Sequence, residues 1–137
     1  MILLDTHVWI WWVHDAPMPW EIENALEDRN EKEELAVSSI SCWEVAKLVE
    51  RGRLDLKTDI GFWLANALGP SGITLLHLTP RVAVEACDLP GEFHRDPADQ
   101  IIVATARVYD IPLLTADQKI RRYPYVDLFD GSTIHDG

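Results

Sequence analysis

Short apolar runs alternate with amphipathic segments along the chain. The runs have the length and the Leu, Ile and Val content of buried strands, and they cover residues 1–5, 34–41, 73–78, 111–115 and 125–129. In the segments between them, apolar positions recur every three or four residues, which predicts helices over 6–14, 20–30, 42–50, 59–68, 79–87, 97–110 and 116–123. Because strands that alternate with helices are typical of parallel sheets, we predict an α/β fold in three layers, with a central, mainly parallel sheet flanked by helices.

Polar residues at the predicted helix starts fit the chemistry of helix caps. In the segment SCWE, Ser41 and Glu44 fit a capping box, in which the glutamate reaches back to the backbone of the cap residue. In DPAD, Asp96 fits the N-cap, proline the first helical position and Asp99 the third. Asp117 can cap the short helix that follows it. Each of these acids therefore has a local structural explanation.

The composition is that of an ordinary globular domain. Hydrophobic residues make up 47% and charged residues 26% of 137 residues, which fits a single domain over 1–137. No apolar stretch approaches the roughly 18 residues of a membrane span, and no basic segment precedes an apolar one at the N-terminus. Cys42 and Cys87 are too few for a disulfide framework, so we expect reduced thiols in the core of a cytoplasmic protein.

The charge changes this picture. A formal net charge of −11 argues against binding nucleic acid, unless some of the acids hold a metal ion or a basic partner covers them. Six tryptophans are also present, and Trp9, Trp11 and Trp12 crowd one segment. Such crowding suggests a protein–protein surface or dimer face as well as a core.

Four acids could converge although they are far apart in the sequence. Asp5 and Asp117 come just after two predicted strands, Glu44 lies in the helix after another strand, and Asp99 lies in the first turn of a helix. In parallel sheets, ligands gather at the carboxyl ends of the strands. Several carboxylates in one cleft repel each other unless a divalent cation lies among them, and Mg²⁺ and Mn²⁺ prefer such oxygen ligands. The spacing permits a shared metal site without requiring it.

Four segments together resemble the motif regions of a known family. They are LLDTHVWIWW, SSISCWEVAKLVERGRLDL, HRDPADQIIVATAR and LLTADQKIRRYPYV, in this order along the chain. The chain is similar to PIN domains, and within them to the VapC toxins of type II toxin–antitoxin pairs. The resemblance runs nearly end to end. It implies a PIN-like α/β fold and a metal-dependent ribonuclease that cuts RNA and inhibits translation.

The resemblance also implies roles for individual residues. The four acids of the motifs match four positions of this chain, namely Asp5, Glu44, Asp99 and Asp117. Asp5 and Asp99 would hold Mg²⁺ or Mn²⁺ directly, while Glu44 and Asp117 complete the acidic pocket and orient the attacking water. Supporting roles fall to three further residues, Thr6, Asp96 and Thr115. We expect Asp96 to act as a helix cap beside the site, and Thr115 as a hydrogen-bond donor that steadies it.

The implied partners are an RNA substrate, a VapB-like antitoxin and a second copy of the chain in a homodimer. The antitoxin tail would block the acidic cleft, often with a basic side chain, and the negative charge of this chain would attract it. Basic residues that could meet RNA phosphate are Arg95, Arg51, Lys119 and Arg121. Solvated helix ends and loop salt bridges explain the same residues.

The sequence leaves two other functions open. In a phosphoacceptor signalling domain, Asp5 or Asp117 would be phosphorylated, but such domains usually pair adjacent acids after the first strand, and Thr6 and His7 follow Asp5 here. A dehalogenase-like phosphatase lacks its D-x-D pattern at the same place. A catalytically inactive PIN-fold binding module would leave the acids dispensable.

Overall fold

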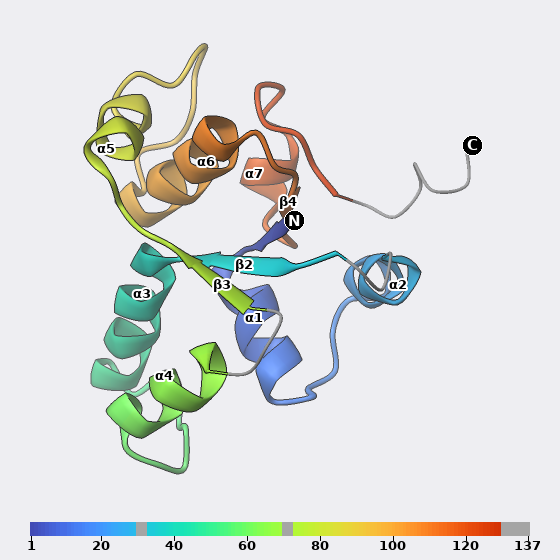
Figure 1. Cartoon of the computed structure of the whole chain (residues 1–137), viewed down its shortest axis with the longest axis vertical. Coiled ribbons are helices and arrows are strands. Elements are labelled where there is room, and N and C mark those ends of the chain that lie inside the picture. The colour runs from blue at the N-terminus through green and yellow to red at the C-terminus, as the bar shows by residue number, and fades with distance from the viewer. Residues whose placement is uncertain (30–32, 70–72, 130–137) are drawn as a thin grey trace.

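The computed structural model describes residues 1–29, 33–69 and 73–129, and within them four parallel strands form one sheet (Figure 1). The strands lie in the order β3–β2–β1–β4. Their bounds are β1 (Ile2–Leu4), β2 (Leu35–Ser38), β3 (Ile73–Leu76) and β4 (Leu113–Leu114). The helices are α1 (Thr6–Val13), α2 (Trp20–Asp28), α3 (Ser39–Glu50), α4 (Ile60–Leu68), α5 (Pro80–Ala86), α6 (Pro97–Tyr109) and α7 (Gln118–Arg121). The predicted α/β class and parallel sheet are confirmed.

Alternating side chains of β1, which lies between β2 and β4, contribute to two separate cores. Ile2 and Leu4 point into a core shared with α1, α2, α3 and α4, whereas Leu3 points into one shared with α6 and α7. Strand side chains alternate between faces, so a strand covered on both sides must be apolar throughout. Figure 1 shows the resulting three layers, with α1, α3 and α4 on one face of the sheet and α5, α6 and α7 on the other.

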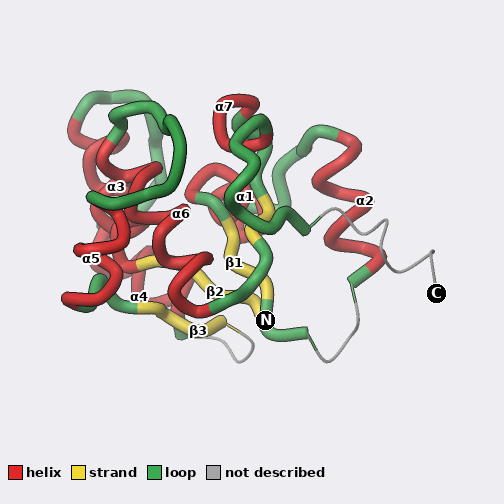
Figure 2. The backbone as a smooth tube through the Cα atoms, turned by 90° about the horizontal axis from the view of Figure 1, so that it is seen from above, coloured by secondary structure: helices red, strands yellow, loops and turns green. Residues whose placement is uncertain are grey.

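Helix α5 is the outermost element on its side of the sheet. It packs along α6, as both views show (Figures 1 and 2), and a third apolar cluster that includes Val82, Ala86 and Ala104 fills the contact. Thr79 caps α5 by accepting a hydrogen bond from Val82 N at 3.2 Å, and Pro80 takes the first helical position. Helix α6 therefore lies between α5 and the sheet, with apolar side chains packed on both sides of it.

Two local predictions are wrong. Residues 125–129 form no strand and contribute only an isolated bridge between Leu113 and Leu128. Helix α3 begins at Ser39, because Ser38 is the N-cap and its hydroxyl accepts from Ile40 N at 3.2 Å. Ser41 therefore lies inside the helix and does not cap it. The cause is that α3 follows β2 directly, without an intervening loop, so the helix begins before the SCWE segment.

Some sequence-based expectations fall partly outside the described residues or differ in detail. The predicted end of the second helix, near residue 30, lies beyond the described part of that segment, and α2 ends at Asp28. Both cysteines are free thiols, but Cys87 is exposed and only Cys42 is partly buried, so the expected core position is wrong for Cys87. Within the described ranges, each helix is too short or too polar to cross a lipid bilayer.

Candidate active site

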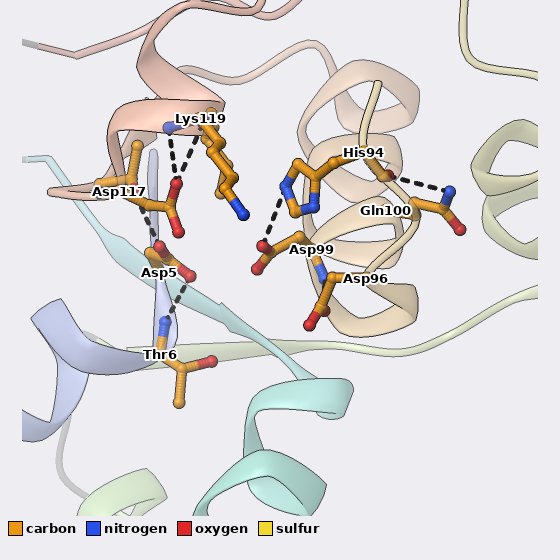
Figure 3. A network of polar contacts seen from close by, with 10 residues as sticks. Asp5, Thr6, His94, Asp96, Asp99, Gln100, Asp117 and Lys119 are labelled. Carbon is orange, nitrogen blue, oxygen red and sulfur yellow. Dashed lines mark hydrogen bonds and ion pairs between the residues drawn. The ribbon is translucent and has the colours of Figure 1, made fainter. Parts of the chain in front are cut away.

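The candidate acids line one cavity of about 390 Å³ at the carboxyl ends of the central strands. Its wall is formed by Asp5, His7, Trp11, Glu44, Asp96, Asp99, Ala116 and Asp117. Strand order explains the convergence: β1 lies between β2 and β4, so the segments that follow these three strands all start at one edge of the sheet. Figure 3 shows Asp5 and Asp117 on one side of the space and Asp96 and Asp99 on the other.

Asp5 is the most buried of these acids, with an exposed fraction of 7%. It caps α1, and its Oδ1 accepts from Thr6 N at 2.8 Å. Its Oδ2 accepts from the Thr115 hydroxyl at 2.6 Å. Burial raises the pKa of Asp5, and the hydrogen bonds from Thr115 and Thr6 act in the opposite direction. The apolar run that precedes Asp5 therefore delivers a carboxylate to a place where protein donors hold both of its oxygens.

Glu44 is positioned by the start of α1. The hydroxyl of Thr6 donates to Glu44 Oε1 and also lies 2.8 Å from the hydroxyl of the buried Ser41. Burial raises the pKa of Glu44, while the Thr6 hydrogen bond opposes the shift and the negative charge of Asp5 adds to it. The predicted capping box is thus replaced by a tertiary contact: Ser41 and Glu44 both meet Thr6, which links α3 to α1.

Asp96 and Asp99 come from the first turn of α6. Asp96 caps the helix as predicted, with its Oδ1 accepting from Asp99 N at 3.0 Å. The Asp99 Oδ2 lies 3.1 Å from His94 Nε2 (Figure 3), so the imidazole of His94 lies against the site. Burial, followed by repulsion from Asp5, Asp96 and the other acids, raises the pKa of Asp99 from 3.8 to about 8.

Three of the acids form a set of oxygen donors suited to a metal ion. Glu44, Asp96 and Asp99 each offer a carboxylate oxygen, and these oxygens lie within 4.8 Å of one another. A cation such as Mg²⁺ or Mn²⁺ takes this kind of ligand, and its charge would offset the repulsion that raises the pKa of Asp99. Asp5 faces the same cavity from outside this group, so its predicted role as a direct ligand stays a prediction. Asp96 is better placed for a metal than its sequence context suggested.

Thr115 connects the two acids that follow β1 and β4. Besides donating to Asp5, its hydroxyl accepts from Asp117 N at 3.0 Å. Asp117 in turn caps α7, as predicted, and its Oδ1 accepts from Lys119 N at 2.8 Å and from Ile120 N at 3.2 Å. One buried hydroxyl therefore sets the position of both acids on this side of the cavity.

Replacing Thr115 tests this connection. Thr115→Val keeps the shape of the side chain but leaves a buried carboxylate oxygen and a backbone N–H without a partner. We expect this to lower the free energy of unfolding by about 1–3 kcal/mol, as measured by urea denaturation. Thr115→Ser retains the hydroxyl and is the matched control, with a loss smaller by at least about 1 kcal/mol. Equal losses of unfolding free energy for the two variants would mean that the hydroxyl of Thr115 stabilises the fold no more than its methyl group does.

The four basic residues considered for RNA differ in their placement. Arg51 lines a second cavity that adjoins the acidic one, and the Lys119 side chain points into the space between the acids (Figure 3). Arg121 is engaged elsewhere, because its Nη1 donates to the Thr115 carbonyl oxygen at 2.9 Å. Arg95 is exposed on the loop before α6.

Three further residues belong to the site although the sequence analysis assigned none of them to it. His7 and Trp11 line the acidic cavity, and Ser41 contacts Thr6 beneath it. A signal for the first two was available: they are four residues apart on α1 and lie on the same helix face, just after Asp5. Of the crowded tryptophans, Trp9 is fully buried in the core.

Three comparisons with known proteins agree with one another. The family model described as PIN domain matches residues 2–125. Ribonuclease VapC22 of Mycobacterium tuberculosis is 36% identical over 123 residues, which are 89% of this chain and 91% of the relative. The structure resembles VapBC2 from Rickettsia felis bound to a DNA fragment from their promoter (TM-score 0.65, 21% identity, 93% and 97% of the two chains). It also resembles a toxin–antitoxin complex from Klebsiella pneumoniae (TM-score 0.62, 21% identity, 90% and 93%).

Proposed function

Because the chain belongs to the PIN domain family, we propose that it is a VapC-type, metal-dependent endoribonuclease that acts as the toxin of a toxin–antitoxin pair and inhibits translation. One observation carries the proposal: acids from four separate segments of a PIN domain line a single cavity at the carboxyl ends of its strands. The match to a curated ribonuclease over most of both chains supports the same reaction. The phosphoacceptor alternative is not supported by this family.

The residues of the cavity suit hydrolysis of a phosphodiester. Glu44, Asp96 and Asp99 would hold Mg²⁺ or Mn²⁺, with Asp5 and Asp99 as the pair implied by the family resemblance. When bound, the metal would act as a Lewis acid on a phosphoryl oxygen and lower the pKa of a water molecule. Asp117 and Glu44 line the same cavity and would orient the attacking water, while hydrogen bonds from Thr115 and Thr6 hold Asp5 and Glu44.

Metal removal is the direct test of this function. Purified protein incubated with total RNA is expected to cleave it in the presence of Mg²⁺ or Mn²⁺ and to lose all detectable cleavage in EDTA, with recovery when the metal is restored. The reason is electrostatic, because an anionic phosphodiester cannot enter a cavity of five carboxylates without a cation. Fragments resolved on a denaturing gel provide the measurement. Cleavage that persists in EDTA would rule out the metal mechanism, and no cleavage under any condition would favour the inactive binding module.

A protein partner and a homodimer are part of the proposal. Relatives of the same fold are described as toxin–antitoxin complexes, and the net charge of −11 favours a partner with a basic segment. A VapB-like antitoxin with such a segment would cover the acidic cavity and exclude RNA. A single domain over 1–137 in the cytoplasm is consistent with this role. Size-exclusion chromatography with light scattering tests the dimer.

A further inference from the structure

A second cavity, of about 250 Å³, lies beside the acidic one. The two cavities share His7, Glu44 and Asp96 in their walls. A bound RNA strand that passes the acids can therefore continue into the second cavity. The residues that line only the second cavity differ in chemistry, because they include Trp43 and the two cations Lys47 and Arg51.

Trp43 is an exposed aromatic side chain held next to a candidate ligand. It precedes Glu44 on α3, and its exposed fraction is 52%. The Lys47 Nζ lies 5.7 Å from the centroid of the Trp43 ring, which places a cation over the ring and leaves about half of the side chain open to solvent. An indole in this setting can stack on a nucleobase, whatever the identity of the base.

The cations on this wall stand out in a protein that is otherwise strongly acidic. Lys47 and Arg51 are four residues apart, so they lie one helical turn from each other on the same side of α3 as Trp43. Lys47 is paired with Glu50 at 3.1 Å, but the glutamate is two-thirds exposed and such pairs are weak, so Lys47 is available to a phosphate. A base platform followed by two positive charges matches the alternating base and phosphate chemistry of a nucleic acid strand.

We propose that Trp43, Lys47 and Arg51 form the binding site for a nucleotide next to the scissile phosphate, with its base stacked on Trp43 and its phosphate beside the two cations. This inference rests on the nuclease function proposed above. The occupant is single-stranded RNA, because a base must be unpaired and turned outward to stack on a side chain. A basic protein segment suits this wall poorly, since Lys47 and Arg51 would repel it.

The test measures the affinity for a fluorescein-labelled, mixed-sequence single-stranded RNA of twelve nucleotides. Anisotropy titrations use Ca²⁺ in place of Mg²⁺, and a gel checks that the strand stays intact. Trp43→Ala is expected to raise the Kd roughly 5- to 100-fold, and Trp43→Phe much less, since a phenyl ring still stacks. Trp20→Ala is the matched control, because Trp20 is 73% exposed on α2 and is expected to leave the Kd unchanged.

A strand of equal length with abasic residues separates stacking from charge. Wild type and Trp43→Ala are expected to bind it equally, because it has no bases to stack. Lys47→Met and Arg51→Met are expected to weaken binding of both strands, and each should reduce the slope of log Kd against log salt concentration by about 1. A Trp43→Ala variant that melts like wild type but binds both strands like wild type would overturn the proposal and leave a protein partner as the occupant.

Cleavage of total RNA by the wild type with Mg²⁺ is measured in parallel. If the wild type cleaves RNA and Trp43→Ala cleaves it with the same kcat and KM, only the proposed nucleotide site is rejected. In an active enzyme, the expected pattern for Trp43→Ala is a higher KM with kcat within about twofold, because the residue binds substrate without touching the reacting atoms. A wild type that cleaves no RNA rejects the nuclease function, and the nucleotide site with it.

Discussion

Asp99→Asn is expected to reduce RNA cleavage by about 10³-fold at saturating metal and neutral pH. Asp99 offers a carboxylate oxygen to the group that could hold a metal and faces the other acids across the cavity. The amide keeps the size and shape of the side chain but removes its charge, so a divalent cation loses an anionic ligand. Initial rates on a labelled RNA that the wild type cleaves provide the measurement.

Asp88→Asn is the matched control for this substitution. It makes the same chemical change at an exposed aspartate after α5, away from the walls of the acidic cavity, and is expected to leave the rate unchanged. In cells, expression of the wild type alone is expected to slow growth, whereas expression of Asp99→Asn is not. Equal cleavage rates for wild type and Asp99→Asn, or equal growth, would contradict the assignment of this acid to the reaction.

The metal-free protein is expected to lose stability as the pH rises toward 8. Burial and then the negative charge of Asp5 raise the pKa of Asp99 from 3.8 to about 8. The folded protein therefore retains a proton that the unfolded chain releases, so the stability linked to it is complete below pH 3.8 and is lost as the pH rises through about 8. The pKa values of Asp5 and Glu44 are shifted in the same direction. Because solvent reaches the cavity, we expect a loss on the order of 2 kcal/mol, or roughly 6–10 °C in Tm.

Thermal melts in EDTA between pH 5 and pH 8.5 measure this loss. Asp99→Asn is expected to melt above the wild type at pH 8 and close to it at pH 5, since the amide has no proton to release. Mg²⁺ is expected to raise the Tm of the wild type more than that of the variant, because a bound cation favours the ionised acids that the variant lacks. Melting curves of wild type and variant that run parallel across this pH range would show that Asp99 is not the source of the pH dependence.

Capping chemistry shows how far local sequence reasoning extends. Asp96 and Asp117 cap their helices as predicted, because a cap depends only on a side chain and the N–H groups two or three residues later. The same reasoning failed for Ser41 and Glu44. Their pattern fits a capping box equally well, but Ser38 caps α3, and the hydroxyl of Thr6, 38 residues before Glu44, engages both side chains. A contact that spans two helices leaves no trace in the spacing of either one.

The strand lengths show a related limit. The apolar run at 125–129 has the composition of a strand, yet only Leu128 forms a bridge to the sheet. Whether an apolar run becomes a strand depends on a neighbour with free backbone groups in register, and this is a property of the assembled sheet.

The sequence by itself determined the alternation of strands and helices along most of the chain, the buried character of the sheet and which acids follow strands or start helices, because hydrophobic periodicity and helix starts are encoded within a few neighbouring residues. Only the tertiary structure decided which carboxylates share a cavity and which oxygens remain available. Asp5 has both oxygens held by Thr6 and Thr115, whereas Asp96 joins Glu44 and Asp99 in one group of donors. The pairing of β1 with both β2 and β4 brings these distant segments to one edge, and such long-range pairing depends on the whole chain packing at once.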